Sequence, residues 1–327
     1  MKAVLVNEDR SLKWAEVPDP VLGQMDCRIQ IQAAALNRAD LMQREGDYPP
    51  PPGCPPWMGL EVAGTIVEMG EGAWEASSWQ IGDRVCALLG GGGYAQYVCT
   101  RYDMLMPVPG GCSMEEAAAL PEAFATAYLN LLLEGGMQAG DTVLITGGNS
   151  GLASVMIPLA RAFGARVITT VRTPEKAARI APLQAHRVIV TSLEPLEEAL
   201  RQEAEAGHPV NVAIDCLGGE TMGRCLPFLA HGARWIMIAA LAGQRSEIDL
   251  KTIYVKNIRI IGSTLRSRTP AFKAELLKKL VKEVWPLVEA GRVRPTIHRI
   301  LPITQAEAAQ EILYRGENVG KVVLRVQ

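Results

Sequence analysis

The stretch TVLITGGNSGLAS, residues 142–154, has three parts of different character. It begins with the apolar, β-branched run from Val143 to Ile145, which is typical of a buried strand. A glycine-rich turn follows, and apolar residues at helical spacing then run from Leu152 to Phe163. The stretch therefore predicts a strand, a tight turn and a helix in direct succession.

Such a turn is suited to binding a phosphate group. The start of a helix offers free backbone N–H groups and a positive dipole end, and small residues let a ligand come close. The spacing here is not the full G-x-G-x-x-G, because counted from Gly147 it reads Gly-x-x-Ser-x-x-Ala. Glycine doublets also occur in ordinary strand-to-helix turns, so a purely structural turn is the alternative. The predicted phosphate-binding residues are Gly147, Gly148, Asn149, Ser150, Gly151 and Leu152.

The sequence after this turn continues the same alternation. A second apolar strand at 166–170 completes one βαβ unit. Further strands are expected at 187–190, 210–214, 233–239 and 257–263, and further helices at 174–181 and 194–205. Alternating strands and helices are the pattern of a parallel sheet covered on both faces. We therefore expect a doubly wound α/β domain of the Rossmann type over residues 123–264, beginning with a helix at 123–133.

The N-terminal part of the chain is rich in strands instead. Strands are expected at 2–6, 27–34, 62–69, 84–88 and 94–98. The proline-rich run at 48–56 cannot join a central sheet and is expected as a rigid surface loop. Many short strands without helical crossovers predict a barrel-like fold.

The end of the chain is expected to return to this β-rich half. An amphipathic helix at 270–289 is followed by a strand at 297–301, a helix at 305–314 and a strand at 321–326. No phosphate-binding turn accompanies these elements. We therefore expect a second domain made of residues 1–122 and 265–327.

The composition excludes several classes of function. A chain of 327 residues that is 48% hydrophobic and 21% charged is typical of a globular protein of two domains. The net charge of −2 argues against nucleic-acid binding, because phosphate contacts need a basic excess. The sequence has no long uncharged apolar run, so no membrane span is expected. The N-terminus resembles a first strand rather than a signal peptide. We expect a cytoplasmic protein.

The cysteines and histidines do not form a metal-binding motif. The sequence contains seven cysteines and four histidines, without a C-x-x-C pair or an H-x-x-x-H spacing. A metal site needs converging ligands at close spacing. We therefore expect free thiols, a reducing compartment and no metal.

Several motifs, taken in order, resemble the zinc-free quinone oxidoreductases of the medium-chain dehydrogenase/reductase superfamily. Within that family the chain is most similar to the subgroup named after the p53-inducible quinone oxidoreductase. The motifs are Asn37-Arg38-Ala39-Asp40-Leu41, Gly46-x-Tyr48-x-Pro50, Gly59-Leu60-Glu61, Gly91-Gly92-Gly93-Tyr94-Ala95-Gln96-Tyr97, Pro121-Glu122-Ala123, Thr264-Leu265-Arg266-Ser267-Arg268 and Asn318-Val319-Gly320-Lys321. The resemblance covers the whole chain and implies a GroES-like catalytic domain beside the Rossmann domain.

The resemblance also implies that the protein acts without zinc. Zinc-dependent members carry a cysteine near position 37 and a Gly-His-Glu where this chain has Gly59-Leu60-Glu61. Asn37 and Leu60 therefore replace two ligands, and neither can substitute for a thiolate or an imidazole. The resemblance implies a structural role for Glu61, and Asp40 is expected to cap the helix that begins there.

The residues after the second strand of the βαβ unit favour NADPH. Enzymes that use NAD usually place an acidic residue there, whereas this chain has Arg172, with Lys176 one helical turn further on. A 2′-phosphate is bound well by such charge-assisted donors. The alternative is that both cations are a solvated helix start. The family usually has a Gly-Ser pair where this chain has Arg172-Thr173, and often a tyrosine where it has Thr191.

The resemblance implies further cofactor contacts. Thr126 resembles the residue that reaches the nicotinamide ribose, and Asn318 and Lys321 resemble residues near the nicotinamide. The loop that holds Ala239 and Leu241 follows a strand end, where ligands bind in open α/β sheets. Arg266 and Arg268 are candidates for covering the nicotinamide end or the pyrophosphate. Exposed loop charge for the two arginines, and a strand-edge charge for Lys321, are the alternatives.

A quinone accepts a hydride directly, so the protein mainly has to orient the cofactor and polarise the acceptor. Tyr48 and Asn37 are the candidate catalytic residues, because a phenol or an amide can hydrogen-bond a carbonyl as negative charge develops. Tyr48 also has a purely structural alternative, as a packing residue in the proline-rich loop.

Three functions remain in competition. NADPH-dependent quinone reduction is the leading hypothesis, and reduction of a C=C bond in an enone or enoyl thioester is the alternative. A non-catalytic nucleotide-binding or structural protein is the third. The resemblance also implies a homodimer or homotetramer that pairs through the apolar strand at 257–263, which would otherwise be an exposed edge.

Overall fold

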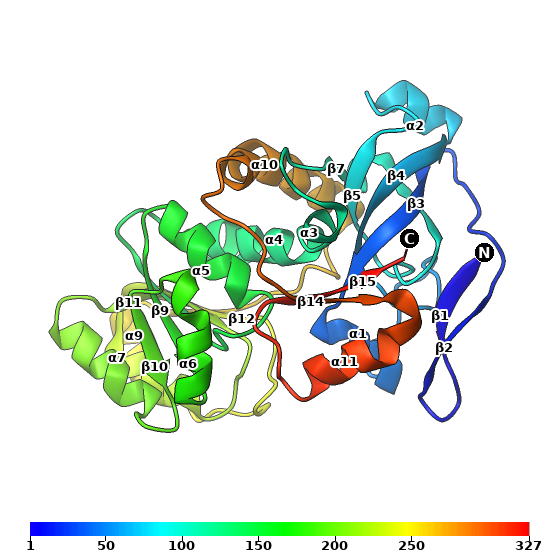
Figure 1. Ribbon diagram of the computed structural model, residues 1–327. Coiled ribbons are helices and arrows are strands. Elements are labelled where there is room, and N and C mark those ends of the chain that lie inside the picture. Colours follow the sequence, from blue (N-terminus) through cyan, green and yellow to red (C-terminus); the bar gives the residue numbers. More distant parts are fainter. Residues whose placement is uncertain (327) are drawn as a thin grey trace. The chain divides into compact units, whose positions relative to one another are not determined.

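The structure of the protein, a computed structural model, describes residues 1–326, which form two compact units (Figure 1). Unit 1 contains Met1–Ala125, Arg268–Gly291 and the residues from Pro295 onward. Unit 2 contains Thr126–Ser267 and Arg292–Arg294. Each unit has its own buried apolar core, and each is described separately below.

Unit 2 is built on a parallel sheet of six strands in the order β10-β9-β8-β11-β12-β13. Counted along the chain within this unit, the order is 3-2-1-4-5-6, which is that of the Rossmann fold. The strands are β8 (Thr142–Ile145), β9 (Arg166–Val171), β10 (Arg187–Val190), β11 (Val210–Asp215), β12 (Leu229–Met237) and β13 (Arg259–Gly262). The doubly wound sheet expected from the alternating sequence pattern is therefore confirmed.

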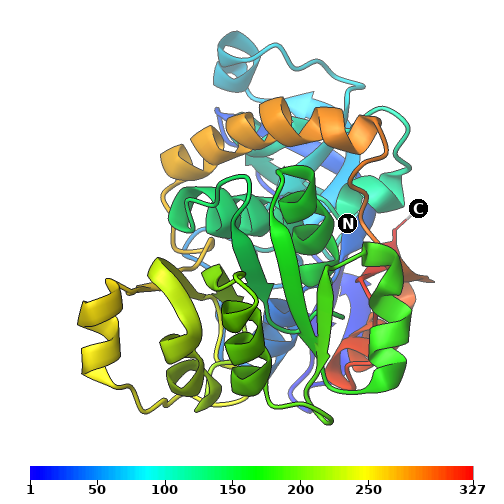
Figure 2. The same cartoon turned by 90° about the vertical axis from the view of Figure 1, so that its left-hand side faces the viewer.

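Helices lie on both sides of this sheet (Figure 2). They are α5 (Ala153–Ala162), α6 (Pro174–Ile180), α7 (Leu196–Glu205), α8 (Thr221–Cys225) and α9 (Leu250–Lys256). The helix α4 (Pro121–Tyr128) continues into a π-helical turn at Leu129–Glu134. Buried side chains such as Leu144, Ile168 and Trp235 fill the space between strands and helices.

One strand of this sheet differs from the sequence-based expectation. β12 begins at Leu229, not at residue 233, and its register against β11 shifts between Val210 and Val212. Gly232 lies in this irregular part with a φ of 73°, a conformation that glycine adopts without strain. Because a bulge interrupts the alternation of buried and exposed residues, the sequence pattern does not show where the strand starts.

Unit 1 contains a mixed sheet in the order β14-β15-β3-β4-β5-β7, with β6 paired to β3, and a separate β1-β2 hairpin. Its strands are β1 (Lys2–Val6), β2 (Leu12–Glu16), β3 (Asp26–Ala35), β4 (Glu61–Met69), β5 (Arg84–Leu88), β6 (Tyr97–Arg101), β7 (Leu105–Pro107), β14 (Ile297–Pro302) and β15 (Lys321–Arg325). The last two strands join this sheet, so the expected return of the tail to the β-rich half is confirmed.

The helices of unit 1 are short apart from one. They are α1 (Arg38–Glu45), α2 (Glu71–Ala76), α3 (Met114–Ala118), α10 (Pro270–Glu289) and α11 (Ala306–Tyr314). Short 3₁₀ turns occur at Tyr102–Met104 and Ile303–Gln305 in unit 1, and at Ala181–Leu183 and Leu226–Phe228 in unit 2. The capping box expected at Ser113 and Glu116 is present at the start of α3.

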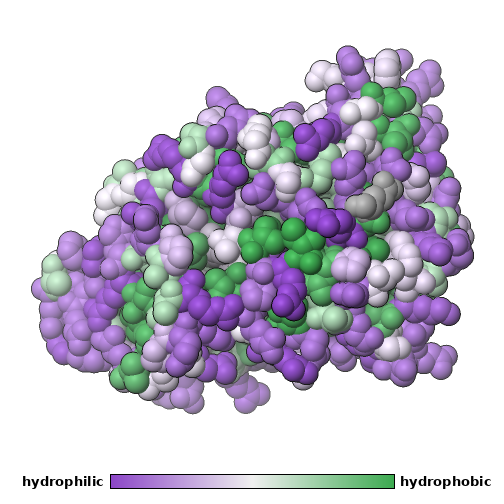
Figure 3. All heavy atoms as spheres, in the orientation of Figure 1, coloured by the Kyte–Doolittle hydropathy of each residue, from purple (hydrophilic) through white to green (hydrophobic). Residues whose placement is uncertain are grey.

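Most of the face shown in Figure 3 is hydrophilic, and its apolar side chains lie in separate patches. None of the helices formed by residues 1–326 combines the length and the apolar character needed to cross a bilayer.

Candidate functional site

The glycine-rich turn of unit 2 lies between β8 and the start of α5. Gly147 has a φ of 69°, and its backbone N–H donates to Thr170 Oγ1 at 3.1 Å. A Cβ atom at Gly148 would lie 2.4 Å from Thr169 Oγ1, so no larger residue fits there without movement. The two glycines therefore hold the turn close against β9.

The turn has backbone donors that the protein does not use. Ser150 Oγ accepts from the N–H of Ala153 at 3.0 Å, which caps one of the first N–H groups of α5. Within residues 1–326, the N–H groups of Gly151 and Leu152 have no acceptor. Because these unpaired donors precede the positive end of a helix dipole, they suit an anionic oxygen.

A buried carboxylate, Asp215, organises the loop next to this turn. Its Oδ1 accepts from Thr146 Oγ1 at 3.0 Å and from the N–H groups of Leu217 at 2.9 Å and Gly218 at 3.2 Å. Its Oδ2 accepts from Trp235 Nε1 at 3.2 Å. Asp215 is only 2% exposed, so these donors replace water around its charge. Asp215 is not among the residues predicted from the sequence, although a carboxylate at the end of an apolar strand was a visible signal.

The loop after β12 pairs with the loop after β11. The N–H of Leu241 donates to Cys216 O at 3.2 Å, and that of Ala242 donates to Leu217 O at 2.7 Å. The predicted cofactor residues Ala239 and Leu241 therefore lie at the carboxyl edge of the sheet, beside the loop that Asp215 holds. The side chain of Leu241 is 51% exposed there.

The end of β9 carries the predicted 2′-phosphate residues. Arg172 directly follows β9 and is exposed, and Lys176 is half-buried in the first turn of α6. Thr173 caps this helix, with its Oγ1 accepting from the N–H of Lys176 at 3.4 Å. Arg172 and Lys176 thus flank a helix N-terminus, which adds to their attraction for an anion.

The two other predicted cofactor residues of unit 2 lie away from these loops in sequence. Thr126 is half-buried within α4, and Arg266 is half-buried after β13. Their contact with a cofactor stays a prediction.

Unit 1 contains a buried polar cluster that we call the Lys321 cluster, made of Asn37, Glu61 and Lys321. Lys321 Nζ donates to Glu61 Oε1 at 2.5 Å, to Asn37 Oδ1 at 2.7 Å and to Leu36 O at 2.8 Å. Asn37 Nδ2 donates to Glu61 Oε1 at 2.9 Å. Lys321 is 3% exposed and Glu61 is fully buried, so Lys321 is not a strand-edge charge.

A second buried carboxylate, Asp40, supports the same region. It accepts from the N–H of Asn37 at 2.7 Å, from the N–H of Gly59 at 3.2 Å and from Tyr94 Oη at 2.9 Å. The bond to Asn37 closes the N-terminus of α1, so the expected capping role of Asp40 is confirmed, with Asn37 as the N-cap residue. Burial raises the pKa of Asp40 to about 6, against the opposing effect of these donors.

The remaining predicted residues of unit 1 lie on loops. Tyr48 is half-buried in the proline-rich loop, and Asn318 Nδ2 donates to Gly320 O at 2.8 Å, directly before β15. The guanidinium of Arg268 stacks over the ring of Phe272, 5.1 Å from its centre. Asn37 and Lys321, two of the predicted catalytic and cofactor residues of this unit, contact each other.

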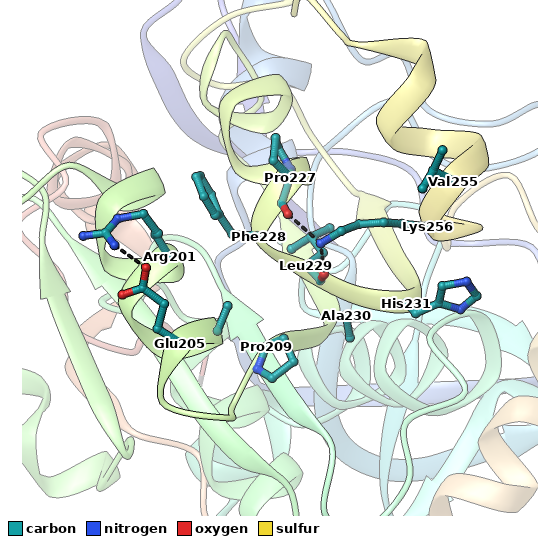
Figure 4. A pocket seen from close by; sticks show the side chains of 11 residues that line it. Arg201, Glu205, Pro209, Pro227, Phe228, Leu229, Ala230, His231, Val255 and Lys256 are labelled. Carbon is teal, nitrogen blue, oxygen red and sulfur yellow. Dashed lines mark hydrogen bonds and ion pairs between the residues drawn. The ribbon is translucent and has the colours of Figure 1, made fainter.

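A hollow of about 700 Å³ in unit 2 is a different feature (Figure 4). It is lined by residues that precede or begin β11 and β12, such as Pro209 and Leu229, so it lies at the amino edge of the sheet. Nucleotides bind at the opposite, carboxyl edge of such sheets. The ammonium of Lys256, which lines the hollow, already donates to the carbonyls of Pro227 and Leu229 at 2.5 Å and 2.8 Å.

Known proteins resemble both units. Residues 23–110 match the family model described as an alcohol dehydrogenase GroES-like domain, and residues 151–282 match the one described as a zinc-binding dehydrogenase. The acryloyl-coenzyme A reductase of Metallosphaera sedula is 30% identical over 353 residues, which cover 99% of this chain and 99% of that relative. This chain belongs to the medium-chain dehydrogenase/reductase superfamily. It is therefore an oxidoreductase with a GroES-like and a Rossmann domain, and the superfamily binds a nicotinamide cofactor.

Quinone oxidoreductases are among the similar members of the superfamily. The quinone oxidoreductase of Sus scrofa is 28% identical over 315 residues, covering 95% of this chain and 92% of that relative. The quinone oxidoreductase from Thermus thermophilus, whose structure is described together with its complex with NADPH, is 29% identical with a TM-score of 0.83. That comparison covers 100% of both chains.

The residues of unit 2 fit a nicotinamide dinucleotide. The unpaired N–H groups of Gly151 and Leu152 suit its pyrophosphate, and the close packing at Gly148 keeps side-chain atoms out of the turn. The residues around Glu61 do not fit a zinc ion. Its hydrogen-bond donors are the amide of Asn37, the backbone N–H of Glu122 and the ammonium of Lys321, which already places a positive charge 2.5 Å from the carboxylate. Residues 1–326 contain no cluster of three or more His, Cys, Asp or Glu side chains that suits a metal.

Proposed function

We propose that the protein is an NADPH-dependent quinone reductase that works without a metal ion. The observation that carries the proposal is the Lys321 cluster, in which an ammonium and an amide surround Glu61 where zinc chemistry would need metal ligands. Oxidation of an alcohol by a dehydrogenase of this kind depends on a Lewis acid to stabilise the alkoxide. A quinone needs no such metal, because its carbonyl oxygens accept charge directly.

In this proposal each domain has its own task. The N–H groups of Gly151 and Leu152 bind the pyrophosphate, and Arg172 and Lys176 bind the 2′-phosphate. Bound NADPH supplies a hydride. In unit 1, Asn37 and Tyr48 donate hydrogen bonds to the acceptor carbonyl and stabilise the negative charge that develops there.

One observation favours a second candidate, reduction of a C=C bond in an enoyl thioester. The relative that is 30% identical across nearly the whole chain is an acryloyl-coenzyme A reductase. In that reaction Tyr48 would be the candidate proton donor to the substrate carbon.

A substrate panel separates the two functions. The purified protein is mixed with NADPH and with ortho- and para-quinones, simple enones or acryloyl-coenzyme A, and NADPH oxidation is followed by absorbance. The proposal expects turnover of quinones that is unchanged after dialysis against a chelator. Turnover of the thioester alone would move the function to C=C reduction, and a loss of activity on chelation would contradict the metal-free mechanism.

We also propose that the protein forms a homodimer through the edge of the Rossmann sheet. β13 forms one edge of this sheet, and Ile260 on it is 39% exposed. The neighbouring helix α9 exposes Leu250, Tyr254 and Val255 by 72%, 67% and 55%. An unpaired apolar edge of this kind is a template for pairing with a second copy.

A further inference from the structure

The ammonium of Lys321 is fully used inside unit 1. An ammonium has three N–H donors, and the three acceptors are Glu61 Oε1, Asn37 Oδ1 and Leu36 O. The side chain is 3% exposed, so it gives up hydration for these bonds. Burying a lysine is unfavourable unless the charge is paired and hydrogen-bonded, as it is here. A direct bond from Lys321 to a cofactor would leave one of these acceptors without its donor.

The backbone is shaped to deliver Lys321 to this place. The N–H of Lys321 donates to Thr296 O at 2.7 Å. The preceding Gly320 has a φ of 86°, and a Cβ atom there would lie 2.2 Å from the same carbonyl oxygen. Only glycine therefore allows the close approach that brings β15 alongside Thr296 and places Lys321 over Glu61.

The cluster fixes which way the Asn37 amide faces. Its Oδ1 accepts from Lys321 at 2.7 Å, and its Nδ2 donates to Glu61 at 2.9 Å. The opposite orientation would put an N–H group against the ammonium and an oxygen against the carboxylate. One N–H of Nδ2 is then left over, with only a long contact of 3.5 Å to Ala35 O.

We propose that Lys321 is a positioning residue that takes the place of a metal ion at Glu61 and holds the Asn37 amide with its remaining N–H ready for the acceptor. This inference rests on the proposed function in one respect, namely that Asn37 contacts the acceptor. Lys321 neutralises Glu61 and acts on the reaction only through Asn37.

A double-mutant cycle between Lys321→Met and Asn37→Ala tests this dependence. Each single variant should lower kcat for a quinone roughly 10- to 100-fold, because a preorganised donor to a developing charge is lost. The double variant should be no slower than the slower single variant. The Kd for NADPH should change less than about threefold, and Lys279→Met, an exposed lysine on α10, serves as the control. The proposal would be overturned if the fold losses in kcat of the two single variants multiplied in the double variant, or if the affinity for NADPH fell strongly.

Lys321→Met leaves the buried carboxylate of Glu61 without its counter-ion, which threatens folding, so a charge-matched variant is needed. Lys321→Met/Glu61→Gln removes both charges and should recover more than half of the loss in the midpoint of urea unfolding. It should stay slow in turnover, because the Asn37 amide is still not fixed. Wild-type turnover in this folded variant would show that Lys321 has only a structural role.

Two measurements do not depend on activity. After equilibrium dialysis against zinc sulfate, we expect the wild type to hold no stoichiometric zinc at Glu61. Stoichiometric zinc that is bound by the wild type but not by Glu61→Gln would contradict the inference. The side-chain amide NMR signal of Asn37, assigned by its loss in Asn37→Ala, should shift in Lys321→Met/Glu61→Gln and stay unchanged in Lys279→Met. If the wild type reduces no quinone, the proposed function fails, and these two measurements alone decide the role of Lys321.

Discussion

The proposed function depends on two arrangements of individual residues, and they differ in how far the sequence predicts them. Arg172 and Lys176 are close in the chain, so their placement at one helix start follows from the strand-turn-helix pattern. Lys321 and Glu61 are 260 residues apart, and their contact depends on β15 joining the same sheet as β4. The motifs identified both residues, but no local pattern shows that one neutralises the other.

Replacing Arg172 should change the choice of cofactor. Arg172→Ala is expected to raise the KM for NADPH roughly 10- to 100-fold, because a charge-assisted bond to the 2′-phosphate is lost. The KM for NADH should change little, since NADH lacks that phosphate. Arg179→Ala, in the last turn of the same helix, is the control. An equal loss with both cofactors would contradict the assignment of Arg172.

Asp215 should matter for cofactor binding through the loop that it holds. In Asp215→Asn the new amide N–H would face Trp235 Nε1, which donates to Asp215 Oδ2 at 3.2 Å in the wild type. Two donors would then oppose each other, which should lower the free energy of unfolding by ~1–3 kcal/mol. We expect a lower urea midpoint and weaker NADPH binding by calorimetry. Adding Trp235→Phe removes the opposing donor and should restore part of both. Unchanged NADPH binding in Asp215→Asn would show that the loop does not depend on this carboxylate.

The buried carboxyl of Asp40 should give the protein a recognisable pH dependence. Because its pKa is raised from 3.8 to about 6, the folded state holds this proton more tightly than the unfolded state. Its contribution favours folding at low pH and is lost as pH rises through about 6, by at most ~3 kcal/mol. As the pH is raised from 4 to 7, the free energy of unfolding in urea should therefore fall more for the wild type than for Asp40→Asn. A constant difference would contradict the raised pKa.

At the scale of elements, the turn between β8 and α5 follows directly from the sequence, and so do most strands and the longer helices. The predicted start of β12 was wrong because the bulge at Gly232 breaks the alternation of buried and exposed residues. The short helices α2, α8 and α9 were missed, since they have too few turns for a helical period to be recognised. β2 and β7 were missed as well, because β2 contains Lys13 and Glu16 and has no fully buried position, and β7 has only three residues.

The packing of this turn against β9 gives a test at the same scale. Gly148→Ala should lower both the urea midpoint and the affinity for NADPH, because the new Cβ would lie 2.4 Å from Thr169 Oγ1. Thr169→Ala in the same chain removes the clashing atoms and should restore part of the affinity. Calorimetric binding of NADPH to both variants checks this. Wild-type affinity in Gly148→Ala would mean that the turn is not closely packed in solution.

At the scale of the whole molecule, the alternation of strands and helices predicts a doubly wound sheet, and the structure adds its strand order of 3-2-1-4-5-6. That order places the ends of β8 and β11 side by side, where the direction of winding reverses. Sequence patterns do not give strand order, because it depends on contacts between distant segments. The division of labour between the two domains stays a proposal.

The proposed dimer belongs to this scale too. Light scattering at micromolar concentration should give twice the mass of one chain. Ile260→Lys, which places a charge on the exposed edge strand, should give single chains that still bind NADPH. A monomeric wild type would exclude pairing through β13.

The most direct test of the proposed function is the steady-state rate of quinone reduction with NADPH and with NADH, before and after exhaustive dialysis against a chelator. We expect turnover with a clear preference for NADPH, and no change on dialysis. Turnover that needs added zinc, or no quinone turnover although NADPH is bound, would contradict it.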